Sequence, residues 1–187
     1  MAEQLHLPES LAMKFIFPHA PLRPVTINSG MVMRAWYDVY SFTDGNREDV
    51  DGLQHSQQLL EQLIIEEMEQ GIEASRIIIG GFSQGAATVL YTTMRSQLKV
   101  GGVIALSGYL PQRHNIQHEN KVNIDTPIFM AHGSEDPIIP MHAGQLSREY
   151  LRAHHYKVDW HDYLMGHEVC AEEIADMQGW IVKELRG

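Results

Sequence analysis

Ser83, in the segment Gly81-x-Ser83-x-Gly85, is the residue of this 187-residue chain best placed to do chemistry. The segment before it, 76–80, contains three consecutive isoleucines, as is typical of a buried strand, and a helical pattern of small residues follows Gly85. A serine between strand and helix is typical of a nucleophile elbow, in which a tight turn exposes the hydroxyl beside the helix N-terminus. A simple packing turn is the alternative interpretation, and the flanking elements favour the nucleophile.

A serine nucleophile needs a base and an acid, which in this type of site follow on later strands in the order serine, acid, histidine. The apolar run 127–131 predicts a strand leading to Asp136, and the run 157–163 predicts a strand leading to His167. A neutral imidazole can take the serine proton, and a carboxylate orients that imidazole and stabilises its charged form. We therefore expect Ser83 to be the nucleophile, Asp136 the acid and His167 the base.

Other residues compete for these two supporting roles, because the chain has 11 histidines and many carboxylates. His132 is the strongest rival base, but its strand should supply the acid, so we interpret it as structural. Glu135 and Asp162 stay open as alternatives to Asp136.

Metal and cofactor sites are not expected. The chain has no H-E-x-x-H motif, no cysteine pair and no glycine-rich phosphate loop. His114 and His118 stand four residues apart with Glu119 next, but their polar surroundings favour a solvated loop. Cys170 follows His167 by three residues, and a buried small residue on the last helix is the favoured interpretation of it.

The pattern of apolar residues predicts alternating strands and helices. Strands are expected near 14–17, 76–80, 103–107, 127–131 and 157–163, and helices over 49–70, after Gly85, over 141–154 and over 168–185. This alternation predicts an α/β protein with a doubly wound, mostly parallel sheet, as a single domain over residues 1–187.

The segments between the first strand and the first helix are expected to be loops. Prolines predict a loop at 18–24, and residues 25–47 are expected to form a long loop over the active face. This second loop carries Met33, Trp36 and Tyr37, which could form a substrate wall or a cap on the core. The adaptable methionine side chain slightly favours an acyl-binding wall.

Composition narrows the functional classes. The net charge of −10 makes nucleic acid an improbable partner and excludes a polybasic membrane anchor. No apolar run reaches the ~18 residues of a membrane span, and the N-terminus has neither a basic region nor an apolar signal core. These features predict a cytoplasmic protein, and a single cysteine excludes an internal disulfide.

Six segments occur in order along nearly the whole chain: FPHAP (17–21), WYD (36–38), GGFSQG (80–85), LSGYL (106–110), HG-x-x-DP-x-x-P (132–140) and GHE (166–168). Together they resemble the phospholipase/carboxylesterase family, which includes the acyl-protein thioesterases. The resemblance implies an α/β-hydrolase fold and cofactor-free hydrolysis of carboxylic esters and thioesters. It also implies that Ser83, Asp136 and His167 form the triad, that the Gln84 N–H is an oxyanion donor, and that Trp36 lies beside an acyl groove.

The chain departs from the family at its N-terminus. Family members begin with a strand that ends in a His-Gly-x-Gly loop, the source of a second oxyanion donor, and nothing similar precedes Phe15. We therefore expect an N-terminally truncated form, in which the strands near 14–17 and 76–80 pair directly or leave a gap. Loss of one oxyanion donor costs roughly 10²–10³ in turnover, so we expect impaired activity.

The expected substrate is a small ester or an acyl-thioester, with an acylated protein or a lysophospholipid as further candidates. The alternative function is that of a catalytically weak or inactive hydrolase-fold protein that binds an acyl ligand or a partner. Unpaired strand edges would also favour a homo-oligomer.

Overall fold

A parallel sheet of four strands, in the order β3-β4-β5-β6, forms the centre of the computed structural model, which describes residues 4–40, 48–115 and 121–186. Its strands are β3 (Ile78–Phe82), β4 (Gly102–Leu106), β5 (Ile128–Gly133) and β6 (Val158–Tyr163). All three neighbouring pairs are parallel, and a helix connects β3 to β4 and β5 to β6. The predicted α/β class with a parallel sheet is therefore confirmed.

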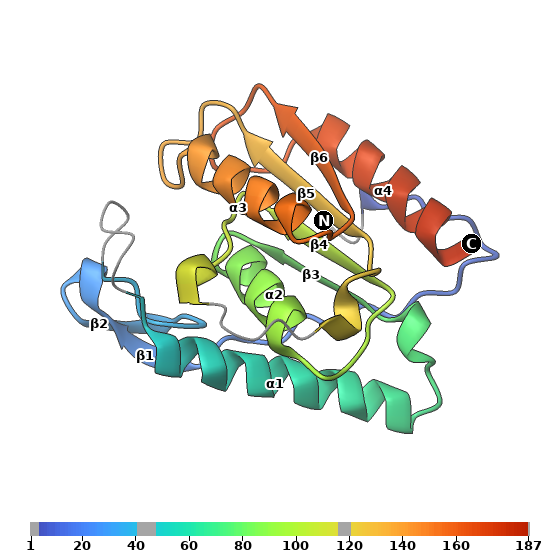
Figure 1. Ribbon diagram of the computed structural model, residues 1–187, viewed down its shortest axis with the longest axis horizontal. Helices are drawn as coiled ribbons and strands as arrows, with labels where there is room; N and C mark the ends of the chain where they lie inside the picture. Colours follow the sequence, from blue (N-terminus) through green and yellow to red (C-terminus); the bar gives the residue numbers. More distant parts are fainter. Residues whose placement is uncertain (1–3, 41–47, 116–120, 187) are drawn as a thin grey trace.

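Helices cover both faces of this sheet, as the doubly wound pattern requires. In Figure 1, α1 (Val50–Glu69), α2 (Gln84–Arg95) and α3 (Met141–Ala153) lie on one side, and α4 (Ala171–Arg186) lies on the other. Side chains alternate between the faces along each strand. Val103 and Met130 pack in the cluster that includes α2 and α3, whereas Ile104 and Phe129 pack against α4.

The predicted helices agree with the structure except at the start of the last one. Asp49 caps α1 by accepting a hydrogen bond from the Gly52 N–H, and Gly71 follows its end with a φ of +92°. The last helix begins at Ala171 and not at residue 168, because the Ile174 N–H bonds to the Cys170 carbonyl as the first helical turn starts. Residues 168–170 therefore extend the loop that carries His167.

The predicted strand near 14–17 is wrong. No backbone ladder forms there; Lys14 instead reaches α1, where its Nζ lies 2.7 Å from Glu67 Oε1. Phe15 and Phe17 are 42% and 69% exposed. Within the described residues β3 pairs only with β4, so direct pairing of residues 14–17 with β3 is not found.

The loop predictions for 18–24 and 25–47 are also wrong in part, because these segments contain a hairpin. Strand β1 (Leu22–Val25) pairs antiparallel with β2 (Met31–Arg34). Pro24 fits because β1 has a neighbour on one side only, so its missing N–H breaks no second ladder. Ser29 and Gly30 have φ of 57° and 76° and turn the chain between the strands. The aromatic residue Phe42 of the predicted loop lies outside the described residues.

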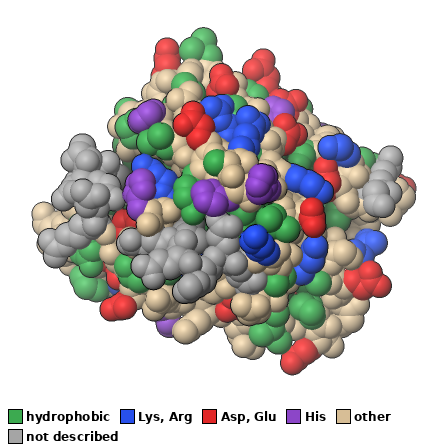
Figure 2. Space-filling view, in the orientation of Figure 1, with side chains coloured by type: hydrophobic (Ala, Val, Ile, Leu, Met, Phe, Trp, Pro, Cys, Tyr) green, Lys and Arg blue, Asp and Glu red, His purple; other side chains and the backbone are tan. Residues whose placement is uncertain are grey.

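The surface of the molecule carries charges of both signs. Figure 2 shows acidic and basic side chains interspersed on one face, with several histidines near its middle. Within the described ranges, no helix combines the length and the apolar character needed to cross a membrane.

Candidate active site

Ser83 stands at the turn between β3 and α2 in a strained backbone conformation. Its φ is 56° and its ψ is −118°, a region that a non-glycine residue seldom adopts. Two backbone hydrogen bonds hold it there: the Ser83 N–H donates to the Leu106 carbonyl at 2.9 Å, and the Ala87 N–H donates to the Ser83 carbonyl at 3.1 Å. The turn thus fixes the hydroxyl at the N-terminal end of α2.

The glycines on either side of Ser83 have different roles. A Cβ on Gly81 would collide with the Gly85 backbone carbonyl, so only glycine fits at that position. A Cβ on Gly85 would meet no atom within 4 Å. Gly108, just after β4, packs closely against this turn. A Cβ there would lie 3.1 Å from the Ser83 carbonyl oxygen and would collide with Ala86.

His167 connects Ser83 with Asp136. Its Nε2 lies 2.9 Å from the Ser83 Oγ, and its Nδ1 lies 2.7 Å from the Asp136 Oδ2. The Phe82 ring, next to the serine, packs on the imidazole with the ring centroids 4.7 Å apart. Three loops, after β3, β5 and β6, therefore bring these three side chains into one hydrogen-bonded chain.

The Asp136 carboxylate is buried and surrounded by donors. Its Oδ1 accepts hydrogen bonds from the Ile138 and Ile139 N–H groups at 2.8 and 2.9 Å, while Oδ2 accepts from His167. Burial raises the pKa of Asp136, but the hydrogen bonds from His167, Ile139 and Ile138 outweigh burial, so the pKa is lowered overall. The group is thereby kept as a carboxylate, the form that can orient an imidazole.

The rival residues lie elsewhere. His132 is buried beneath the Asp136 loop and makes no contact with Ser83 in the described structure. Glu135 is exposed, and Asp162 accepts a hydrogen bond from the Trp160 indole at 3.2 Å. Neither carboxylate replaces Asp136 beside His167.

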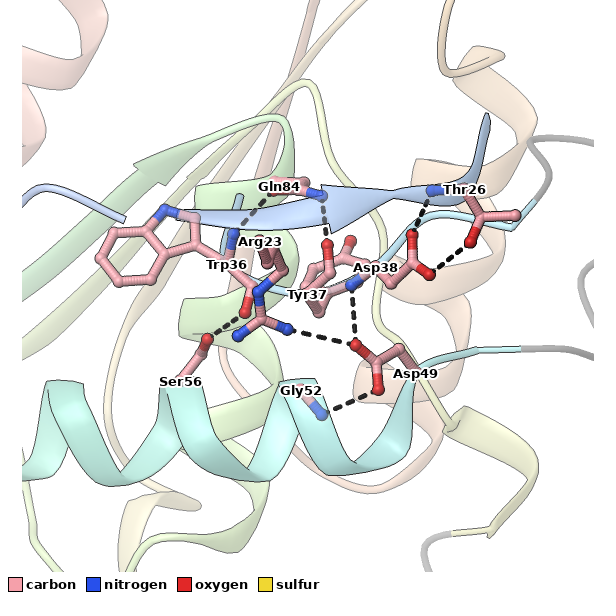
Figure 3. A network of polar contacts seen from close by, with 9 residues as sticks. All are labelled: Arg23, Thr26, Trp36, Tyr37, Asp38, Asp49, Gly52, Ser56 and Gln84. Atoms are coloured by element: carbon pink, nitrogen blue, oxygen red, sulfur yellow. Dashed lines mark hydrogen bonds and ion pairs between the residues drawn. The ribbon is translucent and has the colours of Figure 1, made fainter. Parts of the chain in front are cut away.

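Gln84 is the first residue of α2, so its N–H is one of the helix's free N-terminal donors. Its side chain has a separate task, which Figure 3 shows. The amide oxygen accepts from the Trp36 N–H at 3.0 Å, and the amide nitrogen donates to the Tyr37 carbonyl at 3.0 Å. The residue after Ser83 thus ties the segment 36–37 to the helix that carries the candidate nucleophile.

The three predicted substrate-binding residues have different surroundings. Tyr37 is 2% exposed, and its hydroxyl lies 3.3 Å from that of Tyr109, so it forms part of the core and not an open wall. Trp36 is half-buried against the same cluster. Met33 is 38% exposed on β2, where its sulfur accepts a hydrogen bond from Asn28. Only Trp36 and Met33 retain surface for a ligand.

A second set of polar contacts holds the N-terminal region, residues 4–40, on α1 (Figure 3). Asp49 Oδ2 accepts from the Asp38 N–H at 2.7 Å and from Arg23 at 3.2 Å, while Oδ1 caps α1. The Ser56 hydroxyl of α1 donates to the Trp36 carbonyl. No sequence pattern predicts the contacts of Arg23, Asp38 and Ser56, whereas an Asp three residues before Gly52 at a helix start is the pattern of a cap.

Among the described residues, no group of three or more His, Cys, Asp or Glu side chains could hold a metal ion. Of the group His114, His118 and Glu119 considered in the sequence, His118 and Glu119 lie outside the described residues.

The sequence of this chain is similar to a family of known proteins. Residues 1–185 match the family model described as phospholipase/carboxylesterase. Acyl-protein thioesterase 1 of Yarrowia lipolytica is 44% identical over 179 residues, which cover 92% of this chain and 78% of that protein. Acyl-protein thioesterase 1 of Saccharomyces cerevisiae is 36% identical over 180 residues, covering 91% and 78%.

Solved structures show the same arrangement of the chain. The crystal structure of Arabidopsis thaliana SOBER1 has a TM-score of 0.91 at 29% identity and covers 98% of this chain and 89% of its own. The crystal structure of Zea mays acyl-protein thioesterase 2 has a TM-score of 0.77 at 26% identity, with coverage of 90% and 80%.

Proposed function

This chain belongs to the phospholipase/carboxylesterase family, and we propose that it cleaves its substrates through an acyl-enzyme formed on Ser83. It has the α/β-hydrolase fold and is a hydrolase of the carboxylesterase or thioesterase type. The observation that supports the proposed mechanism is the chain of contacts Ser83–His167–Asp136, with lengths of 2.9 and 2.7 Å. A nucleophile, a base and an orienting acid within hydrogen-bond reach meet the geometric requirement for acyl transfer.

The reaction proceeds in two proton-balanced steps. Ser83 Oγ attacks the carbonyl carbon while His167 Nε2 takes the hydroxyl proton, and Asp136 stabilises the resulting imidazolium. The carbonyl oxygen becomes an oxyanion beside the Gln84 N–H. His167 then returns the proton to the leaving alcohol or thiol, and water, activated by the same histidine, releases the acid and restores Ser83.

We propose an acylated protein or a small ester as the substrate, because the relatives reported above are named acyl-protein thioesterases. The half-buried Trp36 and the exposed Met33 supply apolar surface for the acyl chain. Lysophospholipid is a further candidate from the sequence, and the single domain, the cytoplasmic location and self-association stay predictions.

The turnover is proposed to be weak, because the sequence contains no His-Gly-x-Gly loop that would add a second oxyanion donor to the Gln84 N–H. A single donor leaves about 3–4 kcal/mol of transition-state stabilisation unsupplied relative to a complete pair. The alternative function is the binding of an acyl ligand or partner without catalysis. It predicts that Ser83→Ala leaves the rate of hydrolysis unchanged, so the assay below distinguishes the two functions.

The test is hydrolysis of a short-chain p-nitrophenyl ester and of an acyl-thioester by the 187-residue chain. Ser83→Ala and His167→Ala should each remove nearly all turnover, about 10⁴-fold or more if the complete triad acts, and Asp136→Asn should lower kcat by about 10⁴-fold. Ser75→Ala, at an exposed serine in the short turn before β3, is the matched control and should leave kcat unchanged. Equal rates for the parent and Ser83→Ala, with both folded, would exclude Ser83 as the nucleophile and favour the binding role.

A further inference from the structure

A second histidine lies behind the candidate acid and takes no part in the proposed reaction. His132, near the end of β5, is 1% exposed. Its Nε2 lies 2.8 Å from the Ile139 carbonyl oxygen and 3.5 Å from Asp136 Oδ2. Because a carbonyl oxygen only accepts, Nε2 must carry the proton and donate to Ile139.

With this hydrogen bond, both the N–H and the carbonyl of Ile139 have partners in or beside the turn 136–139. The Ile139 N–H donates to Asp136 Oδ1 at 2.9 Å, and the Ile139 carbonyl accepts from His132. The peptide groups on both sides of Ile139 are thus held, one by the carboxylate and the other by the imidazole. A displacement of the Ile139 carbonyl would therefore move the N–H that orients the carboxylate.

The imidazole of His132 is itself fixed by three elements. It belongs to β5, it stacks on Trp160 of β6 at 6.3 Å with 21° between the ring planes, and it faces α3 at Gly144. A Cβ on Gly144 would lie 2.6 Å from His132 Nδ1, so the glycine leaves room for the ring. Burial lowers the pKa of His132, which keeps the ring neutral and preserves a single donor at Nε2.

We propose that His132 is a positioning residue, which fixes the turn 136–139 so that the Asp136 carboxylate points at His167. The inference rests on the proposed function, because it gives His132 a purpose only if Asp136 orients His167 in catalysis. His132 does not exchange a proton with substrate. It acts through Ile139 on the direction of the carboxylate, and an error of about 1 Å there is enough to cost ~100-fold in rate.

The test compares two substitutions at one position. His132→Leu keeps much of the volume but removes the donor, and His132→Gln places an amide N–H where it can reach the Ile139 carbonyl. We expect His132→Leu to lower kcat about 10- to 100-fold with KM little changed, and His132→Gln to restore most of the loss. Thr126→Val is the control: it removes a buried hydroxyl that contacts the Val100 carbonyl and Asn123 Oδ1, two residues before β5 begins, and it should leave kcat of the folded protein unchanged.

A spectroscopic measurement separates this proposal from the proposed function. In protein labelled with ¹⁵N-histidine, the Nδ1 proton that His167 donates to Asp136 should give a downfield resonance. We expect it to move upfield or broaden in His132→Leu and to return in His132→Gln. If the parent chain lacks Ser83-dependent turnover, the proposed function fails, while this resonance still decides the role of His132.

Two results would overturn the positioning role. One is a folded His132→Leu protein with parent kcat and an unmoved Nδ1 resonance. The other is a His132→Gln protein as impaired as His132→Leu, which would mean that the imidazole is needed for packing and not as a donor. If His132→Leu does not fold, His132→Asn replaces it, because its shorter amide cannot reach Ile139 from the same backbone.

Discussion

The sheet β3–β6 buries its apolar side chains more completely than the N-terminal region 4–40 does. Every residue of β4 and β5 is buried, and Phe129 and Val103 are 0% exposed. In the N-terminal region, Phe17, Met31 and Val32 are each exposed by 65% or more. The two regions therefore differ in how strongly packing determines the position of each residue.

The candidate catalytic groups all belong to the well-packed region. Ser83, Asp136 and His167 each follow a strand of the four-stranded sheet, and backbone hydrogen bonds between neighbouring strands set their separations. The N-terminal region reaches the site through the Gln84 side chain, which bonds to Trp36 and Tyr37, and Asp49 holds the region on α1. We infer that the sheet determines the catalytic geometry and that the N-terminal region shapes the surface that a substrate meets.

The sharpest way to break the packed region is Gly81→Ala. The added methyl would collide with the Gly85 backbone carbonyl, which cannot move without unwinding the first turn of α2. We expect a loss of more than about 4 kcal/mol in unfolding free energy, or failure to fold, together with loss of turnover. Urea denaturation and the ester assay measure the two effects.

Gly85→Ala is the matched control for that substitution, because its methyl would point into open space. Replacing a helical glycine by alanine should be neutral or stabilising by up to about 1 kcal/mol. If Gly81→Ala were tolerated as well as Gly85→Ala, the turn around Ser83 would be far less constrained than its packing indicates.

A buried carboxyl group provides a smaller test of the same region. Glu173, in the first turn of α4, is 0% exposed. Both carboxylate oxygens of Glu173 are buried and have no hydrogen-bond partner in the described structure. Burial therefore raises the pKa of Glu173 from 4.5 to about 7, and the nearby Cys170 backbone offsets this rise only in part. The folded protein therefore binds a proton that the unfolded chain has already lost, so stability decreases as pH rises from about 4.5 to about 7.

Glu173→Gln should remove this dependence. We expect the variant to be more stable than the parent by up to about 3 kcal/mol at pH 8 and by little at pH 4, measured by urea denaturation at both values. Glu172→Gln, at the exposed neighbour, controls for the loss of one charge. If the difference in unfolding free energy between the parent and Glu173→Gln were the same at pH 4 and pH 8, Glu173 would ionise in the folded state as it does in the unfolded chain.

The positions of the strands and helices around Ser83, Asp136 and His167 could be predicted because each depends on local sequence. A short apolar run indicates a buried parallel strand, and the loop that follows it carries polar residues. The contacts of Gln84 and His132 could not be predicted in this way. They join segments far apart in the chain, and no periodicity marks which backbone carbonyl a side chain will reach.

The structure of the N-terminal region could not be predicted from the sequence, for a different reason. Residues 14–17 have the composition of a strand, but a strand exists only with a hydrogen-bonded neighbour, and none lies beside them in the described structure. The sequence left Tyr37 open as part of a substrate wall or of a cap on the core. It is buried, because Leu53 and Tyr91 from two helices pack on it. Both outcomes depend on tertiary neighbours that the local sequence does not specify.

The smallest expected effect tests how the N-terminal region is held. Asp49→Ala removes the cap of α1 and the acceptor for the Asp38 N–H and for Arg23. We expect a loss of about 1–2 kcal/mol in unfolding free energy, because a cap is worth about this much and the N-terminal contacts are partly solvated.

Asp51→Ala, which removes an exposed carboxylate from the same helical turn, is the control and should cost less than about 0.5 kcal/mol. Turnover should change little in either variant if the sheet alone determines the geometry of the three candidate catalytic residues. A large loss of kcat in Asp49→Ala, with stability lowered only as expected, would instead show that the N-terminal region positions Ser83 through Gln84.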